Sequence, residues 1–203
     1  MKTILGCIFL PFFFSVAPLL AQEFVTRGPV PAATSPLFEA SAGYTYFVLD
    51  TPSHQRVFLN GFDANAFVDI RARWGLMADT SYARIGDVLG TGHSGNVISS
   101  LIGPVFYPAA YGNTRVFVHS LAGVSLVDSA VPVSGTYYLG GTVMRFSYAA
   151  GGGVERPLPG GFALRFGGDY LRTTFADSNA AMRFENNFRI VTSIVYRFGN
   201  RGR

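Results

Sequence analysis

The sequence predicts an all-β protein, an eight-stranded antiparallel up-and-down transmembrane β-barrel. Three observations lead to this fold class. Only 14% of the 203 residues are charged, whereas 49% are hydrophobic and 15% aromatic; soluble domains carry about 25% charged residues. Apolar and polar residues alternate in segments of roughly nine to thirteen residues. The charges in these segments fall almost entirely on one face, as expected of strands whose other face meets lipid.

The N-terminus, residues 1–21, is predicted to be a cleaved signal peptide. Lys2 precedes an apolar run from Ile4 to Leu20, and Ala21 supplies a small residue at the cleavage point. An uncleaved anchor is the alternative, but the run is short for a helix that spans a bilayer, which needs about 20 residues. Cys7 is the only cysteine. The mature chain is therefore expected to lack a thiol for a disulfide, a metal or a nucleophile.

Residues 22–37 are expected to form a flexible periplasmic lead-in, because three prolines stand there among small residues. Residues 38–198 form the predicted barrel, and 199–203 a short C-terminal tail. The expected strands are Phe38–Val48, Leu59–Arg71, Trp74–Tyr82, Val97–Tyr107, Thr114–Ser125, Val143–Glu155, Phe162–Arg172 and Phe188–Phe198. Their length matches the roughly 9–11 residues with which a tilted strand crosses a bilayer.

The links between these strands alternate in length. Ala72-Arg73, Pro108–Asn113 and Arg156–Gly161 are short, whereas the other four links run to roughly ten to seventeen residues, a contrast typical of outer-membrane barrels. An even number of strands then places both termini on the short-turn, periplasmic side.

The face that carries the charges is expected to line the barrel interior. It holds six acids, six arginines and a histidine: Glu39, Asp63, Asp69, Arg71, Asp79, Arg115, His119, Arg145, Glu155, Arg165, Asp169, Arg189 and Arg197. An Arg on the lipid face at mid-bilayer costs about 2–4 kcal/mol, so the opposite, lipid-facing side of each strand should be free of charge. Arg172 is the exception, at the loop end of its strand, where its side chain can reach the headgroups. The register of the uncharged strand Val97–Tyr107 stays open.

The balance of acids and bases favours this arrangement over a soluble, lipocalin-like barrel, which carries its charges outside where they need not match. An eight-stranded barrel has an interior just wide enough for side chains to fill it, so we expect a plug of paired charges rather than a wide diffusion pore. Closure of the barrel would bring Glu39 beside Arg197. Trp74, Tyr107, Tyr196 and Phe198, near the periplasmic strand ends, are expected to form an aromatic girdle.

The strand textures resemble those of the eight-stranded outer-membrane barrels typified by the transmembrane domain of outer membrane protein A and by the opacity-type surface proteins. The resemblance covers Phe38 to Phe198 and rests on 61–64, 74–79, 101–104, 116–123, 151–155 and 169–173. It implies a location in the bacterial outer membrane, contact with outer-membrane lipid, and passage through the barrel-assembly machinery. Such barrels normally end on an aromatic residue that this machinery reads, and here Phe198 is followed by five more residues.

No residue pattern points to catalysis. A lipid-modifying barrel enzyme needs a His and a Ser whose side chains meet, but neighbours on a strand, such as His119 and Ser120, point to opposite faces. His93-Ser94 lies in a Gly-rich link without a rigid base. Gly151-Gly152-Gly153 lies within a strand with no helix behind it, so a phosphate loop is excluded. These glycines are expected to make room for large interior side chains.

The sequence therefore predicts a non-catalytic outer-membrane protein, an anchor whose surface-exposed loops serve envelope integrity or adhesion. The alternatives are a narrow ion-conducting channel and a lipid-modifying barrel enzyme. No cofactor or metal is expected. The net charge is +4, and the arginines are scattered singly rather than in basic runs, which argues against a nucleic-acid partner. The ligand of the loops is not encoded in any recognisable motif.

Overall fold

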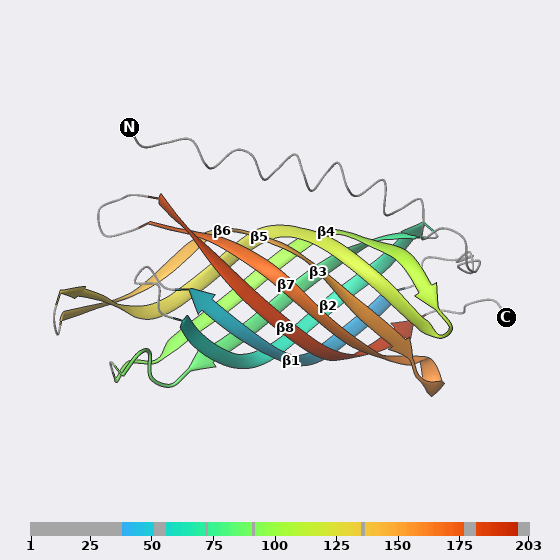
Figure 1. The fold of residues 1–203 in the computed structure, drawn as a ribbon, viewed down its shortest axis with the longest axis horizontal. Coiled ribbons are helices and arrows are strands. Elements are labelled where there is room, and N and C mark those ends of the chain that lie inside the picture. Colours follow the sequence, from blue (N-terminus) through green and yellow to red (C-terminus); the bar gives the residue numbers. More distant parts are fainter. Residues whose placement is uncertain are drawn as a thin grey trace.

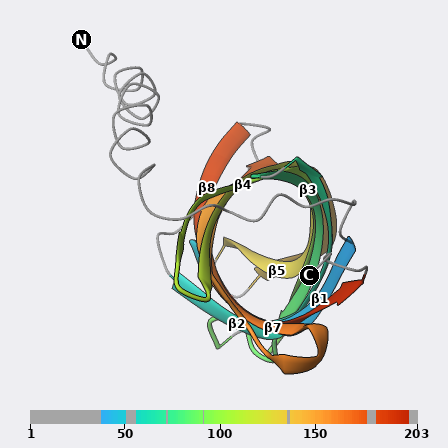
Figure 2. The same ribbon diagram turned by 90° about the vertical axis from the view of Figure 1, so that its right-hand side faces the viewer.

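The chain folds into a closed barrel of eight antiparallel strands, in which each strand pairs with its neighbours in sequence and β1 closes on β8 (Figure 1, Figure 2). The structure is a computed structural model that describes residues 38–50, 56–71, 73–90, 92–134, 137–176 and 182–198. The predicted fold class is confirmed. The predicted signal peptide, lead-in and C-terminal tail lie outside the described residues.

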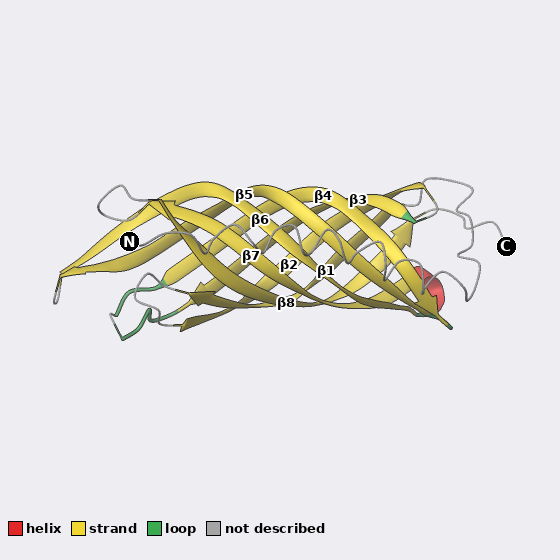
Figure 3. Ribbon diagram, turned by 45° about the horizontal axis from the view of Figure 1, so that its top comes forward, coloured by secondary structure: helices red, strands yellow, loops and turns green. Residues whose placement is uncertain are grey.

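The strands follow one another around the barrel in chain order. They are β1 (Phe38–Asp50), β2 (Arg56–Arg71), β3 (Trp74–Ile85), β4 (Gly95–Tyr111), β5 (Thr114–Ser134), β6 (Tyr137–Pro157), β7 (Phe162–Ala176) and β8 (Met182–Phe198). A short 3-10 turn, η1 (Pro159–Gly161), precedes β7 (Figure 3). Within the described residues, no helix is long and apolar enough to cross a membrane.

The strands are longer than the sequence pattern predicts, from 12 residues in β3 to 21 in β5 and β6. The four links expected to be long shrink accordingly to 51–55, 86–94, 135–136 and 177–181. The prediction of four long loops was wrong because backbone pairing between two strands continues beyond the segments in which the sequence alternates most clearly. Val57 and Ala83, for example, lie beyond the predicted strands and still point into the interior, at 6% and 0% exposure.

The barrel has two distinct ends. We call the end that holds the short turns, Phe38 and Phe198 the lower end, and the opposite end, which holds the other four links, the upper end. Above Asn96–Asp128 on one side and Ser147–Thr173 on the other, β5 and β6 pair only with each other, up to Ser134 opposite Tyr137. This hairpin reaches beyond the other strands (Figure 1). At the upper end the β5–β6 hairpin therefore extends the wall, whereas the described residues of the link 86–94 form turns and bends.

The outer face of the barrel is apolar. Large hydrophobic side chains are exposed on every strand, among them Phe62 at 60%, Phe146 at 62% and Ile194 at 58%. Their neighbours along each strand are buried in the interior, so that exposed and buried residues alternate. Exposure of so many large apolar side chains around the whole barrel is the arrangement of a protein whose surrounding is lipid.

Glycines make the interior wide enough for its large side chains. A Cβ atom added at Gly151 would lie 2.2 Å from Oδ1 of Asp169, and one added at Gly75 would lie 2.2 Å from the ring of Phe67. The prediction that the glycines of β6 make room for interior side chains is thus confirmed at Gly151.

Candidate functional site

The lower half of the interior holds a cluster of ion pairs contributed by five strands. Glu39 of β1 and Glu155 of β6 are at most 1% exposed. Arg165 of β7 binds both carboxylates, at 2.9 Å from Glu39 and 2.6 Å from Glu155. Arg115 of β5 and Arg197 of β8 also contact both carboxylates. We call these five residues the lower cluster.

The lower cluster ties the barrel closed. Glu39 lies opposite Arg197 in the register of β1 and β8, and Nε of Arg197 donates to Oε1 of Glu39 at 2.9 Å. This is the pair expected from barrel closure. Arg165 also donates to Oδ1 of Asn65 on β2, so one guanidinium links residues on four different strands across the interior.

A second group, the middle cluster, lies above the first and centres on Arg189 of β8. This guanidinium is 1% exposed and contacts three carboxylates: Asp169 at 2.5 Å, Asp79 at 2.6 Å and Asp63 at 3.7 Å. His119 of β5 completes the group, with Nε2 2.7 Å from Oδ1 of Asp169. Because the three aspartates come from β2, β3 and β7, Arg189 also crosslinks distant parts of the wall.

An apolar layer fills the interior above the middle cluster. Its members are at most 3% exposed and come from seven strands, β1 to β7: Phe47, Leu59, Ala83, Leu101, Leu121, Ala149 and Leu171. Sequence reasoning expected a plug made of charges and did not anticipate this layer. The alternation along each strand gives these apolar residues the same inward parity as the charged ones. The interior is thus sealed by two ion-pair clusters and a hydrophobic layer.

Two of the predicted site residues lie elsewhere. Arg71 is exposed, because a bulge between Asp69 and Arg71 shifts the register and places Arg71 opposite Trp74 on the outer face.

Tyr107 was expected in the outer aromatic girdle but is 4% exposed inside the barrel. It packs edge-on against Phe67 and lies under the guanidinium of Arg115, 4.6 Å from the ring centroid. The register of β4 was open from the sequence, and the structure turns Val97, Leu101 and Val105 inward with Tyr107.

Two further predicted residues lie inside the barrel wall but outside both clusters. Asp69 is half-buried near the lower end. Arg145 is half-buried on β6 and donates to the carbonyl oxygen of its neighbour Met144. Because Arg71 lies on the outer face, the inward-facing predicted residues are six acids, five arginines and a histidine, so the predicted equality of acids and arginines is wrong. The two clusters contain five acids, four arginines and one histidine, divided as two acids with three arginines below and three acids with one arginine and His119 above.

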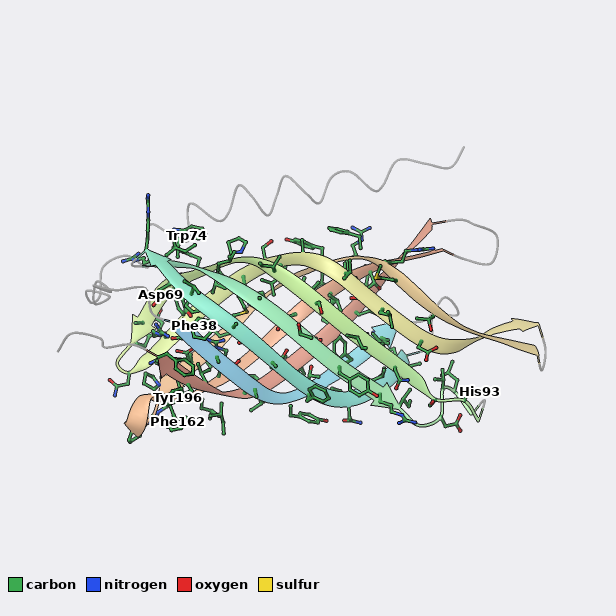
Figure 4. All side chains as sticks on the ribbon, turned by 180° about the vertical axis from the view of Figure 1, so that it is seen from behind. Phe38, Asp69, Trp74, His93, Phe162 and Tyr196 are labelled. Atoms are coloured by element: carbon green, nitrogen blue, oxygen red, sulfur yellow. The ribbon has the colours of Figure 1, made fainter. Side chains whose placement is uncertain are left out.

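Trp74, Tyr196 and Phe198, the other predicted girdle residues, stand on the outer face at the lower end. They are 50%, 40% and 46% exposed. Figure 4 shows Trp74 and Tyr196 at this end together with Phe38 and Phe162, whereas His93 lies at the opposite end. Phe38 contacts Phe198, and Phe162 contacts Tyr196, so that β1, β7 and β8 share one group of rings. Large amphipathic rings at one height are suited to a membrane–water interface.

Sequence reasoning missed a set of polar contacts on the outer face, near the upper end. Three tyrosine hydroxyls donate to asparagine Oδ1 atoms on the next strand: Tyr44 to Asn60, Tyr82 to Asn96 at 3.1 Å, and Tyr170 to Asn186 at 2.5 Å. In each pair the asparagine lies two residues above the position opposite the tyrosine. We call them the Tyr–Asn pairs. A Tyr followed by an Asn 16, 14 and 16 residues later in three hairpins was a signal available in the sequence.

The structure places His119 and Ser120 on opposite faces of β5. His119 binds Asp169 inside the barrel, whereas the Ser120 hydroxyl donates to the Tyr148 hydroxyl outside, at 3.0 Å. This dyad cannot act as a base and nucleophile, as the sequence predicts. His93 and Ser94 are exposed in the link between β3 and β4. Among the described residues, no group of three or more His, Cys, Asp or Glu could hold a metal ion.

Comparisons with known proteins support the fold. No family model matches the chain, and no curated protein matches its sequence. Among solved structures, Neisserial surface protein A is similar with a TM-score of 0.62 at 10% identity, over 79% of this chain and 97% of that one. Ail, the attachment invasion locus protein of Yersinia pestis, gives 0.58 at 15% identity, over 81% and 100%. A major outer membrane protein of Thermus thermophilus gives 0.52 at 12% identity, over 81% and 100%.

The expected resemblance to eight-stranded outer-membrane barrels is thereby confirmed at the level of the fold. The expected location, the bacterial outer membrane, agrees with these structures.

Proposed function

We propose that this chain is a non-catalytic outer-membrane barrel, an anchor that presents its upper hairpins to the outside of the cell for adhesion or envelope integrity. The observation that carries the proposal is the distribution of polarity: the outer face is apolar on every strand, and the ion pairs are sealed inside. A protein built in this way is stable only in a bilayer. Its lower end, with both barrel termini, faces the periplasm.

Adhesion or an envelope role is supported by the contrast between the two ends of the barrel. The lower end has turns as short as Gly112-Asn113, whereas β5 and β6 continue as a free hairpin at the upper end. Such a hairpin offers unpaired backbone edges, to which an extended segment of a partner can add as a strand. Ail, one of the similar structures, is named for attachment and invasion.

Conduction and catalysis are less well supported. The apolar layer and the two clusters fill the interior at successive heights, so an ion would have to displace both kinds of contact. The only His–Asp pair of the middle cluster, His119 with Asp169, has side chains that are 6% and 3% exposed. A lipid substrate on the outer face would not reach it.

The proposed topology can be tested with single cysteines in intact cells. Thr142 in the upper hairpin and Asn113 in a lower turn are both exposed. A membrane-impermeant maleimide should label Thr142→Cys and leave Asn113→Cys unlabelled until the cells are opened. Labelling of Asn113→Cys alone would reverse the proposed orientation, and recovery of both variants from the soluble fraction would contradict the membrane location.

The role of the upper hairpin can be tested separately. Shortening it by removing 131–138 should lower the binding of expressing cells to host-cell or matrix surfaces while the barrel still assembles. If surface binding and resistance of the cells to detergents are both unchanged by this deletion, the hairpin has neither proposed role.

A further inference from the structure

Arg84 stands on the outer face of β3, in a row with two asparagines of the Tyr–Asn pairs. It lies opposite Asn60 of β2 on one side and opposite Asn96 of β4 on the other. Arg84 and Asn60 are exposed, and Asn96 is half-buried. Neighbouring strands are about 4.8 Å apart, so the three side chains span about 10 Å of the barrel surface.

All three side chains have hydrogen-bond donors to offer. The Oδ1 atoms of Asn60 and Asn96 accept from Tyr44 and Tyr82, which turns each amide nitrogen away from its tyrosine. Within the described part of the chain, neither amide nitrogen nor the Arg84 guanidinium has a hydrogen-bond partner. A guanidinium flanked by two amide donors matches the several acceptor oxygens of a phosphate group.

The height of this row coincides with a membrane surface. Arg84 lies ten residues beyond Trp74 in β3. At about 3.3 Å per residue and a strand tilt of about 40°, this distance corresponds to about 25 Å along the barrel axis. The apolar band of an outer-membrane barrel is also about 25 Å tall. With Trp74 at the lower interface, Arg84 therefore lies at the upper one, where lipid headgroups begin.

The surface just below the row favours a lipid over a soluble anion. Phe62 and Ile98 are 60% and 39% exposed on the same face of β2 and β4, where acyl chains would cover them. On the β5 side the row is bounded by an acid, Asp128, which lies opposite Asn96 and accepts from the Thr142 hydroxyl at 3.3 Å. This carboxylate would repel an anion, so we expect the phosphate to be centred on Arg84, within reach of the amides of Asn60 and Asn96 on either side.

We propose that Asn60, Arg84 and Asn96 form a binding site for the phosphate headgroup of an outer-leaflet lipid. The proposal rests on the membrane location and orientation proposed above and adds a lipid class and a site to them. The guanidinium pairs with the phosphate, the two amides donate to its remaining oxygens, and the acyl chains lie over the apolar belt. A zwitterionic headgroup, whose phosphate is shielded by its own cation, binds less tightly.

The site can be tested with the full-length barrel refolded in a neutral detergent. Native mass spectrometry would count retained phosphatidic acid, whose headgroup is a bare phosphate, against phosphatidylcholine. We expect a preference for phosphatidic acid that falls about tenfold in Arg84→Gln, the change that corresponds to one charge-assisted hydrogen bond. The matched control is Arg156→Gln, since Arg156 is also exposed on the outer face but at the lower end.

Three results would overturn the site: no preference for phosphatidic acid, an equal loss in Arg84→Gln and Arg156→Gln, or displacement of the lipid by the same concentration of inorganic phosphate. Heat-modifiable gel mobility of each variant shows whether the barrel has formed. A folded barrel without lipid preference contradicts the phosphate site alone, whereas a wild-type chain that fails to enter bilayers contradicts the proposed function.

Discussion

At the scale of single residues, the interior depends on arginines that each satisfy more than one carboxylate. Arg165 and Arg189 are 4% and 1% exposed, and each contacts acids from at least two other strands. A buried ion pair contributes modestly to stability as a whole, but removing one partner leaves an uncompensated charge, at a cost of about 3–5 kcal/mol. Residues within one cluster should therefore be energetically coupled, and residues of different clusters should not.

This coupling can be measured with double-mutant cycles on equilibrium unfolding in lipid. Glu39→Gln and Arg197→Gln belong to the lower cluster, and their combined effect should fall short of the sum of the single effects by more than about 0.5 kcal/mol. The control cycle pairs Glu39→Gln with Arg189→Gln of the middle cluster, for which the effects should add. Additive effects in the first cycle would mean that the contact of Glu39 with Arg197 does not close the barrel.

The residue scale also shows where prediction from sequence succeeded and failed. Parity along a strand was enough to turn Glu39, Asp169 and Arg189 inward, because adjacent side chains point to opposite faces. It failed at Arg71, beyond a bulge of β2 where one extra residue shifts the register and reverses the parity. It also failed at Tyr107, which has the inward parity of Val97 and Leu101, because β4 carries no charge to show which of its faces lies inside.

At the scale of the strand, each element is defined by which face it shows to lipid. A charged side chain is tolerated where it faces the interior or lies at the end of a strand, and it is destabilising where it faces the acyl chains in the middle of the bilayer. Ile194 is 58% exposed on β8, four residues from its lower end, whereas Leu158 is 45% exposed in the turn before η1. The two are similar apolar, exposed residues, but only Ile194 lies within the apolar outer face that would meet the acyl chains.

Substitution by arginine should therefore separate these two positions. Ile194→Arg places a charge where no group can compensate it and should lower the free energy of unfolding in lipid by about 2–4 kcal/mol. Leu158→Arg should change it by less than about 0.5 kcal/mol. The measurement is denaturant unfolding in vesicles, followed by heat-modifiable gel mobility. Equal effects at the two positions would place Ile194 in water.

Glycines within the strands provide a second test at this scale. Gly151 faces inward against Asp169, whereas the nearest atom to a Cβ at Gly168 would be the Arg189 carbonyl oxygen at 3.7 Å. We expect Gly151→Ala to destabilise the barrel by about 1–3 kcal/mol through overpacking, with Gly168→Ala tolerated. The same unfolding assay measures both variants. A tolerated Gly151→Ala would show that the interior is looser than the structure describes.

The strands show why the upper end could not be predicted. The pattern that identifies a strand is the alternation imposed by a buried face, and the β5–β6 hairpin continues beyond the wall that buries it. Pro132 and the glycines near Leu139 looked like a loop in the sequence. The backbone nevertheless pairs from Asp128 to Ser134 with the opposite strand, because hydrogen bonds between main chains require no alternation.

At the scale of the whole molecule, the sealed interior excludes a wide pore. Phe47, Leu101 and Leu171 in the apolar layer are at most 3% exposed, and the ion pairs below them link opposite walls. Purified protein in planar bilayers should therefore give no steady, porin-like single-channel steps. Large, long-lived steps would show that the interior opens into a wide pore and would contradict the sealed interior, whereas small, steady steps would favour the narrow-channel alternative.

The apolar outer face of the barrel is expected to lie in lipid, and the depth of individual side chains in the bilayer tests this most directly. In a Trp74→Phe background, single tryptophans would replace Phe188, Ile190, Ile194 and Phe198 along the outer face of β8. Their fluorescence would be measured in vesicles of lipids brominated near the middle of the acyl chain. We predict the strongest quenching at 190 and 194 and weaker quenching at 188 and 198, the two ends of the belt. Weak quenching at all four positions, as for a protein in water, would show that the outer face does not lie in lipid.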